Sequence, residues 1–257
     1  MSFKDKLICF KRGRLLDVMN YSLSRIHYDY FLAGGIKEYD KRYKSQFGQD
    51  FFLDRYIFSG KDKGFFIDIG ANHPIALSNS YFFEKKGWDG LAFEPQNMMN
   101  SLWTKDVRTT ECLPYALGDI ECDVEFTEKE DAHVMSGVSS ALKEDPNSGK
   151  VNRYIVKQRR LSSILAERGI KEIDFISIDV EGYEMQVLRG IDFEQVNIKC
   201  IVIENDKHRR SLGSNRLRQW ICKRGYILVA RLTTDDVYVK KDFWEEKCAS
   251  IEKNINS

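Results

Sequence analysis

Residues 64–72 read GFFIDIGAN, and this stretch decides the fold. An apolar run closed by Asp-Ile-Gly is typical of a strand that is buried on both faces and turns sharply at its carboxyl end. Gly70 falls at the turn, where a missing Cβ lets backbone approach a ligand, and we expect the next segment to offer helix-terminal N–H groups. A dinucleotide fingerprint needs G-x-G-x-x-G. An acid before a single glycine instead indicates a pocket for S-adenosylmethionine (SAM).

Strands and helices alternate along the rest of the chain. Apolar runs predict strands at 65–69, 91–94, 111–117, 123–127, 173–178 and 199–203. Helical patterns lie at 51–58, 78–87, 96–105, 160–168, 184–189 and 217–224, and Ser45 is the expected N-cap of the first. Two final runs, 226–231 and 237–240, predict an antiparallel hairpin. The pattern predicts an α/β fold, a doubly wound, mostly parallel sheet with a C-terminal antiparallel hairpin.

We divide the chain into an N-terminal helical appendage, residues 1–44, and one domain, residues 45–257. The appendage is basic and aromatic, and its partial helical periodicity suits either packing against the domain or contact with a membrane surface or a partner. Residues 128–158 are polar and poorly periodic, so we expect a cap or insertion that faces the substrate.

Composition and charge argue against several classes of protein. Forty Lys and Arg residues balance 39 Asp and Glu residues, so no net field favours a polyanion, and a nucleic-acid partner is not expected. The six cysteines form no C-x-x-C pair of the kind that binds zinc. The apolar run at 7–10 is too short for a signal peptide or a membrane span, so we expect a cytoplasmic protein. The oligomeric state is left open.

Acidic side chains follow the predicted strands, at the edge where open α/β sheets bind ligands. A carboxylate at Glu94 can accept both hydroxyl groups of a ribose, and one at Asp119 can accept the amino group of adenine. Asp68 and Asn72 then face the methionine end of SAM. Taken singly, each of these side chains could equally initiate a turn or cap a helix.

Four stretches of the chain belong together: SQFGQD at 45–50, FIDIGAN at 66–72 with SNS at 78–80, the segment from GW at 87–88 to FEP at 93–95, and IDFISIDVEG at 173–182. With them the chain resembles the FkbM family of SAM-dependent methyltransferases. The resemblance covers about residues 45–206. It implies a Rossmann-like SAM-dependent methyltransferase fold and O-methylation of a hydroxyl group on a sugar, a glycan or a small natural product.

These stretches and the strand ends together give a set of cofactor-binding residues. The set is Gln46, Asp68, Gly70, Asn72, Ser78, Asn79, Glu94, Pro95, Asp119 and Asp179. The chain departs from the family pattern at Pro74, where many relatives have a glycine. Because proline has no N–H, any main-chain contact from that position is in doubt.

A hydroxyl acceptor is a weak acid, so a base or a metal must help to remove its proton. Asp179, Glu204 and Asn205 offer two acids and an amide oxygen at neighbouring strand ends, a donor set that suits Mg²⁺ or Mn²⁺. The set is similar to that of catechol O-methyltransferases. The alternative is a metal-independent mechanism in which Glu181 or His208 is the base, while Asp179 and Glu204 only hydrogen-bond loops. The catalytic candidates of the two mechanisms are Asp179, Glu181 and His208.

Two further classes compete with an O-methyltransferase. A nucleic-acid methyltransferase would call for a polar-Pro-Pro-aromatic turn and a basic groove, whereas residues 179–182 read DVEG. A non-catalytic interaction module has no reason to keep an acid at every strand end. The sequence therefore predicts a SAM-dependent O-methyltransferase for a small-molecule or glycan acceptor.

Overall fold

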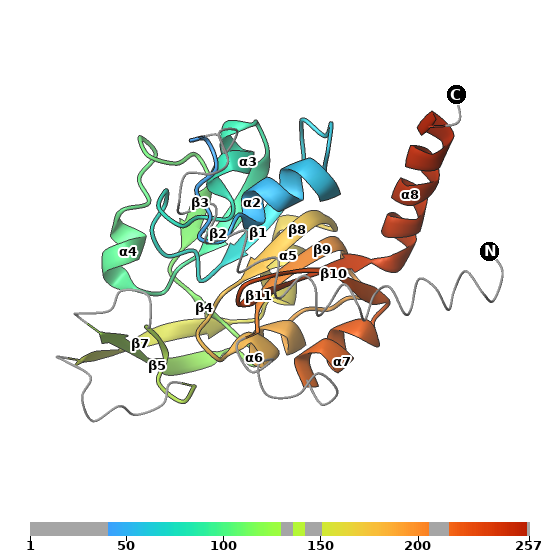
Figure 1. Cartoon of the computed structure of the whole chain (residues 1–257). Coiled ribbons are helices and arrows are strands. Elements are labelled where there is room, and N and C mark those ends of the chain that lie inside the picture. The colour runs from blue at the N-terminus through green and yellow to red at the C-terminus, as the bar shows by residue number, and fades with distance from the viewer. Residues whose placement is uncertain (1–40, 130–135, 142–150, 206–215, 256–257) are drawn as a thin grey trace. The chain divides into compact units, whose positions relative to one another are not determined.

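The computed structural model describes residues 41–129, 136–141, 151–205 and 216–255 (Figure 1). The chain forms two compact units, Tyr43–Glu204 and a second unit of Met1–Arg42 with Asn205–Ser257. Most of the predicted appendage lies outside the described residues, and so does His208. The predicted domain boundaries stay a prediction.

A parallel sheet forms the centre of the larger unit. In the described part of this unit its strand order is β9-β8-β1-β2-β3. The strands are β1 (Phe65–Ile69), β2 (Asp89–Phe93), β3 (Glu111–Leu113), β8 (Glu172–Ile178) and β9 (Asn197–Glu204). The chain runs from β1 to β2 and β3 on one side and returns with β8 and β9 on the other. The order therefore reverses between β1 and β8, at the kind of switch point where open α/β sheets bind ligands.

The carboxyl ends of these strands are in register. Ile69 pairs with Phe93 and with Ile178, and Ile178 pairs in turn with Ile203. Phe93 also pairs with Leu113. The residues that follow form one row along the sheet edge: Gly70, Glu94, Pro114, Asp179 and Glu204.

The central strands are buried on both faces. In β1, Phe66 and Ile67 point to opposite faces, and both are 0% exposed. The Phe66 ring stacks on Phe175 of β8, with ring centroids 5.7 Å apart, and Phe83 packs on the same Phe175 at 4.8 Å. Strands covered on both faces give continuous apolar runs, which is why the sequence located them.

The helices of this unit are short. They are α2 (Gln49–Phe52), the π-helix η1 (Leu53–Ile57), α3 (Tyr81–Lys85), α4 (Asn97–Ser101), α5 (Leu161–Arg168) and α6 (Glu184–Arg189). The predicted positions are confirmed, but Ser45 as an N-cap is wrong. The N-cap of α2 is Gly48, at φ 80°, and the Ser45 hydroxyl donates instead to the buried Asp50. Asp50 also accepts the N–H groups of Lys44 and Phe51, so SQFGQD builds a turn around one carboxylate.

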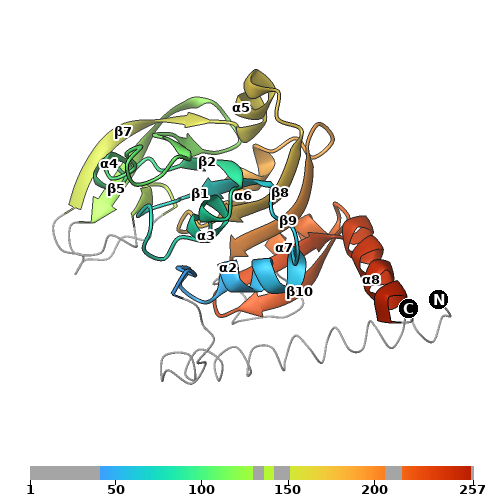
Figure 2. The same ribbon diagram turned by 90° about the horizontal axis from the view of Figure 1, so that it is seen from above.

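A second sheet has the order β4-β7-β5-β6. Its strands are β4 (Ala116–Leu117), β5 (Cys122–Lys129), β6 (Gly137–Val138) and β7 (Val151–Arg159), and Figure 2 shows β5 and β7 side by side outside the main sheet. The single strand predicted at 111–117 is wrong, because it is divided between the two sheets. Pro114 cannot donate to a ladder, and the Tyr115 N–H turns back to the Leu113 carbonyl at 2.9 Å.

Most of strand β7 lies in the segment that was expected to be a weakly structured cap, so that expectation is wrong for residues 151–158. The strand pairs with β5 from Val151 to Gln158. The inward-facing Gln158 is 2% exposed, and its amide donates to the Ile120 carbonyl at 2.9 Å. A polar residue on the buried face hides the alternating pattern that would have revealed the strand.

The smaller unit contains the predicted C-terminal hairpin. Strands β10 (Tyr226–Leu232) and β11 (Asp235–Lys240) are antiparallel, flanked by α7 (Arg216–Cys222) and α8 (Lys241–Ile255). The buried Asp236 accepts hydrogen bonds from Asn205 and Tyr238, and Arg231 lies 3.1 Å from it. Within the residues that the structure describes, no helix is long and apolar enough to cross a membrane.

Candidate functional site

A cavity of about 300 Å³ lies at the carboxyl edge of the main sheet of the larger unit. Residues from the ends of β1, β2 and β8 line it, and the second sheet supplies part of its wall. The predicted residues around it are Gln46, Asp68, Gly70, Asn72, Ser78, Asn79, Glu94, Pro95, Asp179 and Glu181. The structure thus brings most of the predicted set, from segments far apart in the sequence, around one space.

Asp119 does not line this cavity. It follows β4 in the second sheet and does not stand at the end of a main-sheet strand, so its predicted position is wrong. The cause is the break at Pro114, which sends the chain into the other sheet three residues earlier than expected. Tyr115, Ala116 and Leu117 line the cavity in this region.

Gly70 is required by contact between strands, and this corrects the reason that the sequence suggested. Its φ is +74°, and a Cβ placed there would lie 1.7 Å from the Asp179 carbonyl oxygen. The segment after β1 is also a loop, because α3 begins only at Tyr81. The expectation of helix-terminal donors directly after Gly70 is therefore wrong.

Glu94 is the buried acid of the row, 5% exposed at the end of β2. Its two carboxylate oxygens accept the N–H groups of Asn72 and Gln96, both at 2.7 Å. Burial raises the pKa of Glu94 to about 7, with a smaller contribution from the neighbouring Asp68 and Glu128, although the two N–H groups act in the opposite direction. The Glu94 side chain therefore titrates near neutral pH.

The raised pKa of Glu94 predicts a pH-dependent stability. The folded state favours the protonated form, so this carboxyl group makes the free energy of unfolding fall as pH rises from about 4.5 to about 7. Glu94→Gln removes that titration. We expect the difference in unfolding free energy, wild type minus variant, to fall by an amount on the order of 3 kcal/mol across this range. Urea unfolding at pH 4.5, 6 and 8 measures it, and a pH-independent difference would contradict the assignment.

Asp68 is the second buried acid, 4% exposed. Burial raises its pKa, while the hydrogen bond from the Ser80 hydroxyl and the charge of Arg108 lower it. Because Asp68 pairs with Ser177 of β8 across the sheet, the acid stands at the switch point itself. Ser177 in turn accepts a hydrogen bond from the Asn79 amide at 2.9 Å.

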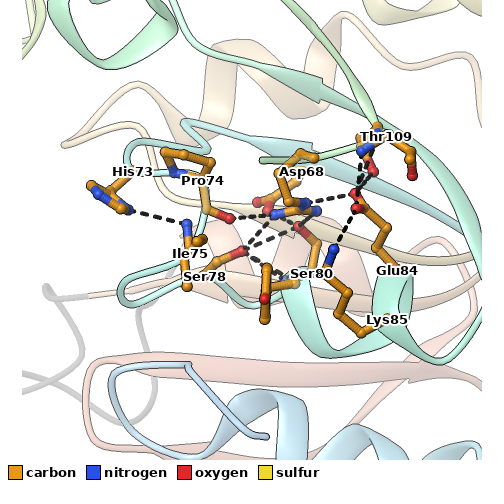
Figure 3. Close-up of polar contacts among 12 residues, drawn as sticks. Asp68, His73, Pro74, Ile75, Ser78, Ser80, Glu84, Lys85 and Thr109 are labelled. Atoms are coloured by element: carbon orange, nitrogen blue, oxygen red, sulfur yellow. Dashed lines mark hydrogen bonds and ion pairs between the residues drawn. The ribbon is translucent and has the colours of Figure 1, made fainter. Parts of the chain in front are cut away.

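Sequence reasoning missed Arg108, which holds the loop between β1 and α3. This residue is 2% exposed, and its guanidinium donates to Glu84 and to the Pro74 carbonyl, both at 2.6 Å. It also donates to Ser80 at 3.1 Å (Figure 3). Its local sequence, KDVR at 105–108, looks like a solvated charge run, so no local signal could have identified it.

The Asn79 side chain offers an acceptor that a ligand in this cavity could use. Its carboxamide oxygen is buried and has no hydrogen-bond partner within the described part of the chain, and Asn79 is one of the residues that line the cavity. A buried acceptor without a partner costs free energy unless a ligand or water satisfies it. The cavity also holds four acids, Asp68, Glu94, Asp179 and Glu181, and no Lys or Arg among its described lining residues. These features fit a ligand such as SAM, which carries a sulfonium, an ammonium and two ribose hydroxyl groups besides one carboxylate.

Asp179 and Glu181 lie on the turn after β8. The Asp179 N–H donates to the Ile69 carbonyl at 3.0 Å, which fixes the start of the turn beside Gly70. Glu181 has a φ of +54°, unusual for a residue other than glycine, and Gly182 follows at +101°. Such backbone strain concentrates at functional sites.

Only one of the three predicted metal ligands, Asp179, lines the cavity. Glu204 stands in the same row on β9 but is not part of the lining. Asn205 belongs to the smaller unit, where its amide donates to the buried Asp236 at 2.7 Å. No group of three or more His, Cys, Asp or Glu residues suited to a metal occurs in the described part of the chain. The metal centre stays a prediction, and we derive no step through one.

The second sheet closes one side of the cavity. Phe126 and Val138 belong to its buried apolar cluster and also line the cavity. Polar contacts tie this sheet to the end of β2: Gln96 donates to Glu128 at 2.9 Å, and the Asn97 N–H donates to Tyr154 at 3.1 Å. The part of the predicted cap at 136–138 therefore does face the site.

Comparison with known proteins gives three findings. The family model of the methyltransferase FkbM domain matches residues 68–228, which are more than half of the chain. A crystal structure of a TehB-like SAM-dependent methyltransferase from Corynebacterium glutamicum is 11% identical, covers 86% of this chain and 99% of its own, and has a TM-score of 0.37, which is too low for an argument. Small ribosomal subunit protein eS6 from Thermoplasma volcanium is 27% identical over 104 residues, 37% of this chain and 80% of that protein, and shows no common family at this level.

Proposed function

We propose, because this chain belongs to the FkbM methyltransferase family, that it binds SAM in the cavity at the carboxyl edge of its sheet and methylates a hydroxyl group. The observation that carries the proposal is the convergence on this cavity of Glu94, Asp68 and the buried, unpartnered Asn79 oxygen. The acceptor is a sugar, a glycan or a small natural product.

The charge of the cavity narrows the acceptor class. Its four acids, with no Lys or Arg among the described lining residues, disfavour a phosphate or another anion beside the reacting hydroxyl. A neutral polyhydroxyl compound meets no such repulsion. The same argument disfavours a nucleic acid, whose backbone phosphates require cationic partners.

Each side chain then has a role that its position suggests. Glu94, held by the N–H groups of Asn72 and Gln96, would accept the ribose hydroxyl groups. SAM supplies an activated methyl group when bound, so the protein has to orient the acceptor oxygen and receive one proton. Glu181 would receive that proton, and Asp179 would orient the acceptor, since both line the same cavity.

Two variants separate binding from chemistry. Glu94→Ala should weaken SAM binding about 100-fold in calorimetry, because it removes a charged acceptor. Glu181→Gln should keep the wild-type affinity and lose methyl transfer by about 100-fold or more. Glu111→Ala is the control, because Glu111 forms an exposed pair with Arg168 away from the cavity.

The acceptor itself is identified by mass spectrometry of glycans and metabolites from cells with and without the gene, as a mass difference of one CH₂ unit. The Glu181→Gln variant should abolish this difference. Full SAM affinity in Glu94→Ala would remove the ribose assignment, and wild-type transfer in Glu181→Gln would remove the base assignment.

A further inference from the structure

The main chain of the loop after β1 has no N–H group to offer a ligand between Gly70 and Ala76. The N–H groups of Gly70 and Ala71 both donate to the Phe93 carbonyl, at 3.0 and 3.1 Å. That of Asn72 donates to Glu94 at 2.7 Å, and that of His73 donates to the Asn72 side-chain oxygen at 2.7 Å. These hydrogen bonds hold the start of the loop in place, and they leave none of its main-chain N–H groups for a ligand.

The second half of the loop closes in the same way. Pro74 has no N–H, and the Ile75 N–H donates to Nδ1 of His73 at 3.1 Å (Figure 3). The Ala76 N–H donates to the same nitrogen at 3.0 Å. A main-chain anion site needs successive unpaired N–H groups. This stretch has none, so a ligand must be held by side chains here.

His73 is fixed in one tautomer by these contacts. An atom that accepts two N–H groups carries a lone pair and no proton, so the proton of the neutral imidazole is on Nε2. In the flipped orientation of the His73 ring, a C–H group instead of Nδ1 would face the N–H groups of Ile75 and Ala76. The partly exposed His73 lines the cavity, and its Nε2–H is therefore a donor available to that wall.

We propose that the Nε2–H of His73 donates to the carboxylate of the amino-acid portion of SAM, in place of the missing main-chain donors; this inference rests on the proposed function. A carboxylate in this cavity faces four acids and no cationic lining residue among those described, so it depends on neutral donors. Two amide groups of the wall each already donate one N–H to the protein, Asn79 to Ser177 and Gln96 to Glu128. Pro74, which departs from the family pattern, removes one further donor beside His73.

Two isosteric variants separate the roles of the ring nitrogens. Asparagine at position 73 keeps an acceptor near Nδ1, and so the turn, but removes the donor. Glutamine keeps a donor near Nε2 and removes the acceptor. Calorimetry is done with SAM and with methylthioadenosine, which shares the nucleoside of SAM but lacks its amino-acid portion. Loss of the hydrogen bond from His73 to the carboxylate weakens only SAM binding, whereas a disrupted loop weakens the binding of both ligands.

We expect His73→Asn to weaken SAM binding about 10- to 100-fold, the range for a charge-assisted hydrogen bond, and to leave methylthioadenosine binding within about twofold. His73→Gln should retain more of the SAM affinity than His73→Asn does. Wild-type SAM affinity in His73→Asn, or equal losses for both ligands, would overturn the proposal. If the wild-type protein binds neither ligand, the proposed function fails instead.

The tautomer can be measured without any ligand. Nitrogen-15 NMR of the ligand-free protein should show His73 with a protonated Nε2 and an unprotonated Nδ1. A proton on Nδ1 would contradict the hydrogen bonds from Ile75 and Ala76 and overturn the assignment.

Discussion

Replacing Arg108 by methionine is expected to lower the free energy of unfolding by about 3–5 kcal/mol, the cost of removing one partner from a buried ion pair. The guanidinium donates to Glu84 and to the Pro74 carbonyl, both at 2.6 Å. Burial opposes the charge on Glu84, yet the bonds from Arg108 and Thr110 lower its pKa to about 2. Without Arg108, Glu84 would be a poorly compensated buried charge. Urea unfolding measures the loss.

An exposed arginine is the control for this experiment. Arg168 forms a two-point contact with Glu111 at 2.6 and 3.0 Å, and Arg168→Met should cost less than about 1 kcal/mol because water screens the pair. Equal losses in the two variants would contradict the role assigned to Arg108. If Arg108→Met does not fold, Arg108→Lys is the substitute, because lysine keeps the positive charge but lacks the several N–H donors of the guanidinium. It should show an intermediate loss of unfolding free energy.

The double variant Arg108→Met with Glu84→Gln tests whether the lost free energy of unfolding comes from the unpaired, buried Glu84 carboxylate. It should be more stable than the single Arg108 variant, because it removes the charge that the arginine compensates. If the stability losses of the two single variants simply add in the double variant, the loss in Arg108→Met comes mainly from packing. The Arg108 guanidinium carbon lies 4.6 Å from the centroid of the Trp103 ring.

The row of site residues could be predicted because it depends on local sequence. Apolar runs fix where buried strands end, and parallel pairing then aligns those ends. Gly70, Glu94 and Asp179 were found in this way, since each directly follows its run. No knowledge of distant contacts was needed to place them on one edge.

The residues that support the row could not be predicted, because their burial depends on partners far away in the chain. Arg108 contacts Glu84, 24 residues earlier, and Pro74, 34 residues earlier. Gln158 donates to Ile120, 38 residues earlier. Nothing in the residues next to Arg108 or Gln158 distinguishes them from solvated polar side chains, so the sequence did not reveal that either is buried.

Gly70→Ala is expected to cost about 3–5 kcal/mol, since it combines overpacking with an unfavourable positive φ. Its new Cβ would lie 1.7 Å from the Asp179 carbonyl oxygen, which is backbone and has no rotamer to escape into. To relieve this contact, the end of β8 must move away from β1. The loop that carries Asp179 and Glu181 would move with it, so SAM affinity should fall along with stability.

Gly60→Ala separates the two contributions. Gly60 has a φ of +76°, nearly the +74° of Gly70, but nothing lies within 4 Å of a Cβ placed there. It should therefore show the conformational cost alone, about 1–2 kcal/mol in urea unfolding, with SAM affinity unchanged. The excess loss in Gly70→Ala then measures the contact between β1 and β8. If the two variants lose the same stability, Gly70 serves only its turn, and the close approach of the two strand ends does not constrain the site.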